Sequence, residues 1–270
     1  MLRPIYLQPG DKVALISPSG VATKEQLDAA CSLLTSWELE PVPGQHVLSR
    51  HGRLAGTDEE RLHDLQTALD AEDIRSIWCM VGDYGMLRIV QEADYSIFQG
   101  NPKWVIGMND ITVLHSKLHS LGIESLHAFM PSDYNTTSPE VVTQLRNFLF
   151  GIISSYAIPA HPFNRPGIVE TEMIGGMLQW VHNLHDTCIE RNTRGTILFI
   201  EDPSNDLYEI DRNVKCMKYT GKFQHLAGLI VGEFGKDSTP EFKEEVTPWK
   251  ITRTPCVSVF RPDTCATISP

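Results

Sequence analysis

The stretch that decides the fold is Lys103-Trp104-Val105-Ile106-Gly107-Met108-Asn109-Asp110-Ile111-Thr112. Its first half is apolar and β-branched, which predicts a buried strand over 103–107. That strand ends abruptly, and a helix is predicted from about Ile111 through Leu121. A strand, a sharp turn and a helix in this order have the layout of a nucleophile elbow, whose turn residue, here Asn109, projects beyond the carboxyl edge of a sheet.

Outward from the elbow, short apolar runs alternate with longer amphipathic segments. Strands are predicted at 12–16, 76–80, 103–107, 196–200 and 229–231, and helices at 24–37, from Thr57 onward, and at about 208–220. This alternation favours a parallel sheet with helices on both faces. The predicted fold class is therefore α/β.

A change in composition predicts two domains. The stretch around 158–167 holds three prolines and has no helical period, so it is predicted to be a linker. Residues 1–150 are predicted to form an N-terminal domain with a mostly parallel sheet and flanking helices. Residues 151–167 would then be the linker, and 168–270 a smaller C-terminal α/β domain.

Composition narrows the function classes. With 23 Lys and Arg against 34 Asp and Glu among 270 residues, the net charge is −11, which argues against nucleic acid or an anionic membrane as partner. No apolar run approaches the roughly 20 residues that span a bilayer, and no signal-peptide core follows Met1. Six cysteines lack CxxC spacing. Four of them (Cys31, Cys79, Cys188, Cys216) adjoin apolar residues, which predicts reduced, buried thiols and a cytoplasmic setting.

The elbow resembles the Gly-x-Ser-Asp-Ile-Thr turn of the LD-carboxypeptidase family, which includes the microcin C immunity peptidases. The likeness extends in order over some 230 residues, each motif being modest alone. Further matching segments are the loop 17–20, the helix start Ala55-Gly56-Thr57-Asp58-Glu59-Glu60-Arg61, the loop 79–85, Gly175-Gly176-Met177-Leu178, and 197–202 followed by Tyr208, Ile210, Asp211 and Arg212.

The resemblance implies a serine carboxypeptidase, a hydrolase that releases D-alanine from murein tetrapeptide in peptidoglycan recycling. It implies a Ser–His–Glu triad, an oxyanion hole of backbone N–H groups and a homodimer, with no cofactor and no metal. Carried onto this chain, the glutamate is Glu201, and the oxyanion and substrate-binding positions are Gly82, Asp83 and the backbone of Asp110.

The departures from the family pattern lie at positions to which the resemblance assigns catalysis and carboxylate recognition. Asn109 stands at the nucleophile position, and an amide cannot form an acyl-enzyme. Val81 replaces the loop arginine, Asp83 the second loop glycine and Met177 the asparagine of the family's GGNL motif. Residues 254–265, where the family carries its histidine, contain none.

These departures predict a catalytically impaired or inactive family member, a pseudoenzyme, with a cleft for a peptide or muropeptide-like ligand. Whether the chain is an enzyme stays open. One alternative is an active carboxypeptidase or amidase with a rearranged site, for which His127, just after the elbow helix, is the candidate histidine. Another is a non-catalytic scaffold. Asn109 either only maintains the turn or contacts a ligand, and Glu201 is either a surface carboxylate or a retained site residue.

The remaining histidines and cysteines give weaker signals. His115 and His119 lie four apart and His182 and His185 three apart, but the HExxH glutamate is absent, so no metal is predicted. The residues His46, His51 and His63 are predicted to be solvated surface. Cys79, inside an apolar strand, is predicted to be an inert buried thiol.

Overall fold

The computed structural model describes residues 1–152 and 167–234, and the backbone of 266–268. The chain divides into two compact units, Met1–Ser155 and Tyr156–Pro270, which are described separately. The predicted linker falls almost entirely outside the described residues.

The first unit is built on a five-stranded parallel sheet in the order β2-β1-β3-β4-β5. Its strands are β1 (Lys12–Ile16), β2 (Glu40–Pro43), β3 (Ile74–Cys79), β4 (Trp104–Gly107) and β5 (Leu126–His127). The chain moves from β1 outward to β2 and then back past β1 to β3. The connections therefore diverge between β1 and β3, which is the switch point where open α/β sheets bind ligands at their carboxyl ends.

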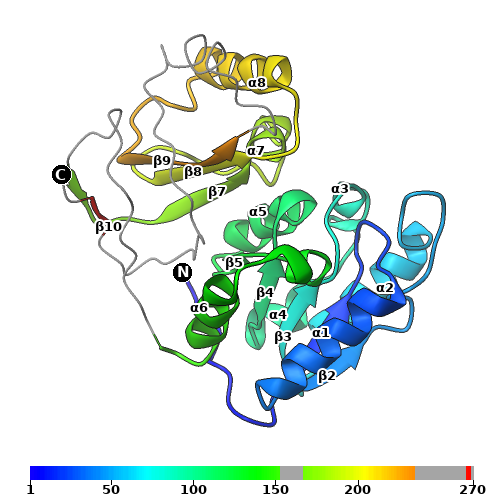
Figure 1. Ribbon diagram of the computed structural model, residues 1–270. Coiled ribbons are helices and arrows are strands. Elements are labelled where there is room, and N and C mark those ends of the chain that lie inside the picture. Colours follow the sequence, from blue (N-terminus) through cyan, green and yellow to red (C-terminus); the bar gives the residue numbers. More distant parts are fainter. Residues whose placement is uncertain (153–166, 235–265, 269–270) are drawn as a thin grey trace. The chain divides into compact units, whose positions relative to one another are not determined.

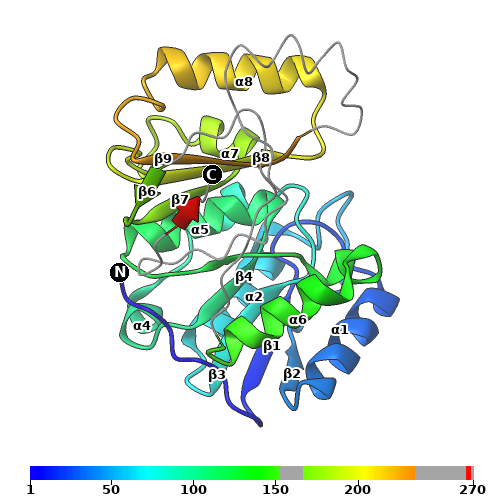
Figure 2. The same cartoon turned by 60° about the vertical axis from the view of Figure 1, so that its left-hand side comes forward.

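Helices cover both faces of this sheet (Figures 1 and 2). They are α1 (Lys24–Ser36), α2 (Asp58–Asp70), α3 (Met86–Ile89), α4 (Ser96–Gly100), α5 (Thr112–Ser120) and α6 (Pro139–Leu149), with 3₁₀ turns η1 (Asn109–Ile111) and η2 (Pro131–Thr136). Thr23 and Thr57 are the N-cap residues of α1 and α2, and both form complete capping boxes. The Gln26 and Glu60 side chains accept hydrogen bonds from the backbone N–H groups of Thr23 and Thr57.

The core of the first unit is aromatic. Trp78 and Trp104 are fully buried on adjacent strands. Trp78 stacks on Trp37 at 6.0 Å between ring centroids, and Trp104 meets Phe148 of α6 edge-on at 5.2 Å. These rings fasten helices to the sheet and leave its carboxyl edge to the loops.

The second unit has a three-stranded parallel sheet in the order β7-β8-β9. Its elements are β6 (Gly167–Val169), β7 (Met173–Met177), α7 (Leu178–Asn183), β8 (Ile197–Asp202), α8 (Leu207–Tyr219) and β9 (Gly228–Phe234), and β6 pairs antiparallel with β10 (Ala266–Ile268). Leu198, Ile200, Val214 and Met217 lie in one core cluster that joins α8 to the sheet.

The α/β class and the mostly parallel sheet predicted from the sequence are confirmed, and the five predicted strands are all present. Gly221, two residues after the end of α8, has φ 77°, the left-handed conformation that commonly ends a helix. The sequence did not reveal β7, because glycines at 175 and 176 hide its strand pattern. The prediction of four buried thiols was wrong: of the cysteines among the described residues, Cys79 alone is buried and Cys188 is exposed.

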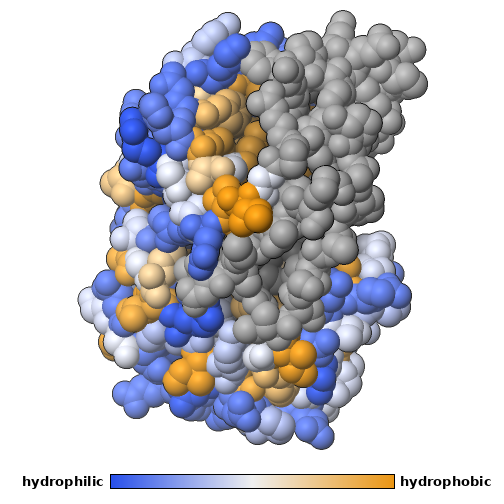
Figure 3. Space-filling view, turned by 90° about the vertical axis from the view of Figure 1, so that its left-hand side faces the viewer, coloured by the Kyte–Doolittle hydropathy of each residue, from blue (hydrophilic) through white to orange (hydrophobic). Residues whose placement is uncertain are grey.

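The surface shows no broad apolar face in the view of Figure 3, where hydrophobic residues form small separate patches among hydrophilic ones. Exposed large side chains such as Ile5, Ile97 and Tyr219 come from different elements. Among the described residues, no helix combines the length and apolar character that crossing a membrane requires.

Candidate active site

Three loops meet at the carboxyl edge of the first sheet, one each after β1, β3 and β4. Strand register brings them together, since Ile16 pairs with Cys79 and Trp78 with Ile106. The loop after β1 is joined to the loop after β3 by the Gly20 N–H, which donates to the Gly82 carbonyl at 2.8 Å. The site residues predicted in this half of the chain therefore lie at the switch point of the sheet.

Asn109 forms the predicted elbow between β4 and the helical segment η1-α5. Its φ is 59°, in the left-handed region, where Asn is among the few non-glycine residues that are tolerated. Its half-buried side chain makes no hydrogen bond to any described residue. The turn is tight because Gly107 packs under Ile111, and a Cβ at position 107 would lie 2.8 Å from Ile111 Cγ1.

Gly82 lies directly against the elbow. A Cβ at this position would come within 2.7 Å of Asn109 Cβ, so only glycine lets the loop after β3 approach so closely. Neither the Gly82 N–H nor the Asp110 N–H donates a hydrogen bond to any described residue. The elbow side chain is thus accompanied by two backbone N–H groups without a hydrogen-bond partner among the described residues.

Asp83, the next residue, also has a left-handed backbone, with φ 77°. Its carboxylate forms an ion pair with the exposed Arg53, and Nε of Arg53 donates at 3.2 Å to Asp83 Oδ2. Asp83 stands where the family has a glycine, and the loop can keep its left-handed backbone there because Asp tolerates positive φ. The pair places one charge of each sign at the rim of the site.

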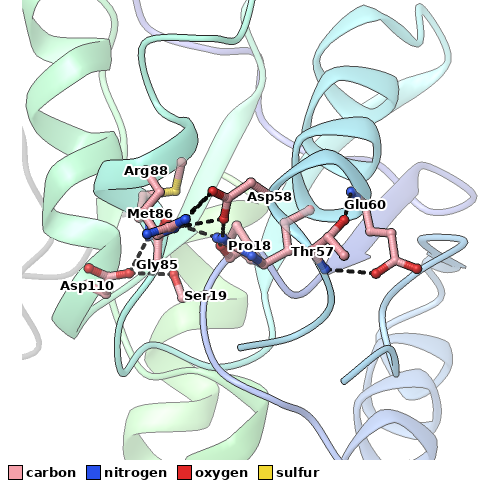
Figure 4. Close-up of polar contacts among 10 residues, drawn as sticks. Pro18, Ser19, Thr57, Asp58, Glu60, Gly85, Met86, Arg88 and Asp110 are labelled. Atoms are coloured by element: carbon pink, nitrogen blue, oxygen red, sulfur yellow. Dashed lines mark hydrogen bonds and ion pairs between the residues drawn. The ribbon is translucent and has the colours of Figure 1, made fainter. Parts of the chain in front are cut away.

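Asp110, which follows the elbow residue, is fully buried and ties the three loops together (Figure 4). Its Oδ2 accepts hydrogen bonds from Ser19 Oγ at 2.6 Å and from the Met86 N–H at 2.7 Å. Its Oδ1 has no hydrogen-bond partner among the described residues. Burial raises the pKa of Asp110 to about 6, against the opposing effect of these two hydrogen bonds.

Arg61 supports the same loops from α2. Its guanidinium is buried, and Nη1 donates to the Pro18 carbonyl at 2.6 Å and to the Gly85 carbonyl at 2.9 Å. Nη2 pairs with Asp58. Asp58 also binds Arg88 (Figure 4). Sequence reasoning missed Arg61 and Ser19 as supports of the site. A family motif contains Arg61, but nothing local indicates that its side chain reaches the loops.

The predicted acid Glu201 belongs to the second unit. It lies near the end of β8, opposite Met177 of β7, and the register with β9 shifts between Ile200 and Asp202. Such irregularities re-aim side chains at sheet ends. Glu201 is 9% exposed, and a Cβ at Gly232 would lie 2.8 Å from Glu201 Cβ and 3.0 Å from its Oε2. Glu201 is therefore a nearly buried, closely packed carboxylate rather than a surface one.

The other candidates are mostly structural. Both ring nitrogens of His115 are engaged, Nδ1 with Ser125 Oγ at 2.8 Å and Nε2 with the Gly107 carbonyl at 2.9 Å. His127 is buried on β5 opposite Gly107. Burial strongly raises the pKa of the Cys79 thiol, which argues against a thiolate nucleophile there. Residues 254–265 lie outside the described residues.

The fold and this edge define an α/β protein with an elbow-type site of the kind used for acyl transfer. Residues 13–128 match the family described as LD-carboxypeptidase N-terminal domain, and residues 170–258 match LD-carboxypeptidase C-terminal domain. The chain therefore belongs to the LD-carboxypeptidase family.

Similar proteins agree with this assignment. The probable murein peptide carboxypeptidase of Bacillus subtilis (strain 168) is 32% identical over 238 residues, covering 86% of this chain and 75% of that relative. The murein tetrapeptide carboxypeptidase of Pseudomonas aeruginosa is 28% identical over 239 residues, covering 84% and 78%.

Solved structures share the fold. The muramoyltetrapeptide carboxypeptidase from Oxalobacter formigenes superposes with a TM-score of 0.79 at 22% identity, covering 91% of this chain and 87% of that one. The MccF-like protein from Bacillus anthracis str. Ames gives 0.81 at 22% identity, covering 98% and 92%.

Proposed function

We propose that this chain binds the acyl or carboxylate end of a murein-type peptide at the elbow without forming an acyl-enzyme. The observation that carries the proposal is Asn109 at φ 59°, packed against Gly82, with the N–H groups of Gly82 and Asp110 donating to no described residue. Two backbone donors beside a neutral amide suit a ligand oxygen that carries partial or full negative charge.

Acyl transfer at this site would lack its nucleophile. In acyl transfer a hydroxyl or thiolate attacks the carbonyl carbon, and the amide nitrogen of Asn109 has no lone pair available for that attack. The retained Glu201 cannot substitute, because in the family pattern the acid assists a histidine. The proposal therefore treats the chain as a binding-competent pseudoenzyme.

The names of similar proteins indicate the class of ligand that we propose. Curated relatives are named as murein peptide and murein tetrapeptide carboxypeptidases, and one solved structure is an MccF in complex with aspartyl sulfamoyl adenosine. We extend the murein-type peptide to this chain, together with a role in peptidoglycan recycling, a cytoplasmic location and a homodimer.

The test measures binding and turnover separately. Wild-type protein is titrated with murein tetrapeptide by calorimetry, and D-alanine release is followed in parallel. We expect saturable binding with no release above the buffer blank. Asn109→Gly, which keeps the left-handed turn, should weaken binding roughly 2- to 10-fold, the value of one hydrogen bond. Asn109→Ser alone should not produce release.

Each other outcome has a definite meaning. D-alanine release by the wild type that disappears in Glu201→Gln would show an active enzyme with a rearranged site. Absence of binding in a folded protein would favour the scaffold alternative, and either result would overturn the proposal.

A further inference from the structure

Two histidines and an aspartate meet at the edge of the first unit, away from the elbow. His46 lies in the loop after β2, and His63 and Asp64 are adjacent on α2. One ligand atom from each of these three residues lies within 4.8 Å of the other two. The sequence predicted His46 and His63 only as solvated surface, because residues that lie 17 apart in sequence give no spacing signal.

The Asp64 carboxylate is held in place before any ligand arrives. Its Oδ2 accepts a hydrogen bond from the backbone N–H of His46 at 2.8 Å. Its Oδ1 lies 3.3 Å from His63 Nδ1. The side chain is buried, and a Cβ at Gly44 would overlap it. One Asp64 oxygen is therefore fixed by a backbone hydrogen bond, and the other faces an imidazole. In metal sites, hydrogen bonds of this kind orient the carboxylate that binds the metal.

A second carboxylate is arranged in the same way. Oε2 of Glu60 accepts the Thr57 N–H at 2.8 Å as part of the α2 capping box (Figure 4), and its Oε1 lies 3.5 Å from His46 Nδ1. Among the described residues, no Lys or Arg pairs with Glu60 or Asp64. Two imidazoles and two carboxylates therefore lie together, and neither carboxylate is paired with a Lys or Arg of the described residues.

The only other such group among the described residues shows the contrast. His185, Asp186 and Glu190 also bring their ligand atoms within 4.8 Å. There, however, Lys222 Nζ contacts Glu190 Oε1, and the same oxygen faces His185 Nδ1 at 2.9 Å. An ammonium already provides the positive charge, so the second group needs no metal ion.

We propose that His46, His63 and Asp64 form a site for a divalent first-row transition metal of the zinc type. Imidazole and carboxylate donors suit zinc, and its bond lengths of 2.0–2.2 Å place neighbouring tetrahedral ligand atoms about 3.3 Å apart. The separation of 3.3 Å between His63 Nδ1 and Asp64 Oδ1 equals that edge, and the ligand atom of His46 lies within 4.8 Å of both. The His63 side chain is 53% exposed, which leaves room for water as a further ligand.

Such a metal would fasten the loop after β2 to α2. The same loop accepts a hydrogen bond at the Val47 carbonyl from Ser17 Oγ at 2.7 Å, and Ser17 begins the loop after β1. The metal would therefore stabilise the margin of the candidate active site without joining its chemistry. This proposal does not depend on the proposed function, because it concerns different side chains.

The test uses the metal alone. Zinc is titrated into metal-free protein by calorimetry, and thermal unfolding is followed with and without zinc. We expect one zinc per chain, a raised melting temperature, and at least a 10-fold loss of affinity in His63→Ala. His51→Ala is the matched control, since His51 is an exposed neighbour outside the cluster and should bind zinc as the wild type does.

Cobalt substitution checks the identity of the ligands. Bound Co²⁺ should show d–d absorption without thiolate-to-cobalt charge transfer, because no cysteine belongs to the cluster. Equal zinc affinity in His63→Ala and the wild type, a thiolate band, or absence of stoichiometric binding would overturn the proposal.

Discussion

The turn at Asn109 and the strand end at Glu201 differ in what each position requires of the residue that occupies it. Each lies at the carboxyl end of an interior strand of a parallel sheet, β4 in the first unit and β8 in the second. Each is crowded by a glycine, Gly82 in the first unit and Gly232 in the second. At Asn109 the backbone is left-handed, whereas Glu201 lies in a strand whose backbone suits any residue.

The first position restricts the backbone conformation of its residue, whereas the second does not. The elbow demands a residue that tolerates positive φ, and Asn satisfies that demand without a hydroxyl. The position of Glu201 makes no such conformational demand, so the retained carboxylate reflects its side chain. Under the proposed function, the elbow keeps its backbone without the reactive atom, whereas the Glu201 position keeps a carboxylate where the backbone would accept any residue.

The largest effect is expected from removing Arg61, the buried cation that supports the loops after β1 and β3. Arg61→Ala leaves the Pro18 and Gly85 carbonyls without their donor and Asp58 without one partner. We expect the free energy of unfolding to fall by about 3–5 kcal/mol, as for other buried charge networks. Urea unfolding followed by tryptophan fluorescence measures this. Arg53→Ala, which removes an exposed pair with Asp83, is the control and should cost about 0–1 kcal/mol.

A change in pH tests the buried charge beneath the elbow. Because burial raises the pKa of Asp110 from 3.8 to about 6, the folded protein binds this proton more tightly than the unfolded chain. The stabilisation is complete below about pH 4 and is lost as the pH rises through about 6. Asp110→Asn cannot titrate, so its stability relative to wild type should increase by roughly 3 kcal/mol between pH 4 and pH 7. A constant difference across this range would contradict the assignment.

A smaller effect should appear on the Glu201 side of the comparison. In Gly232→Ala the new methyl group would lie 2.8 Å from Glu201 Cβ, which the strand backbone holds in place. We expect a loss of about 1–3 kcal/mol from overpacking. Gly167→Ala has open space at its Cβ position and should change stability by less than about 0.5 kcal/mol. Equal stability of the two variants would show that Glu201 moves aside easily.

Some elements were predictable because their signals are local. Thr57 followed by Glu60 forms the capping box that begins α2, and the apolar run before Asn109 forms β4. Strand β7 was hidden because Gly175 and Gly176 carry no side-chain pattern. Their backbones have φ 136° and 140°, and a Cβ on Gly175 would collide with the Phe199 carbonyl. Only the pairing of β7 with β8 shows why glycine stands there.

The sequence by itself determined the family, the parallel α/β class and the elbow with Asn109 at its turn. These follow from order along the chain, which motif spacing and hydrophobic periodicity record. Only the tertiary structure decided that Asp110 binds Ser19, that Arg61 supports two loops, and that His46 meets His63. Hydrogen bonds and ligand geometry depend on distances of about 3 Å between atoms that lie far apart along the chain, and no local pattern encodes those distances.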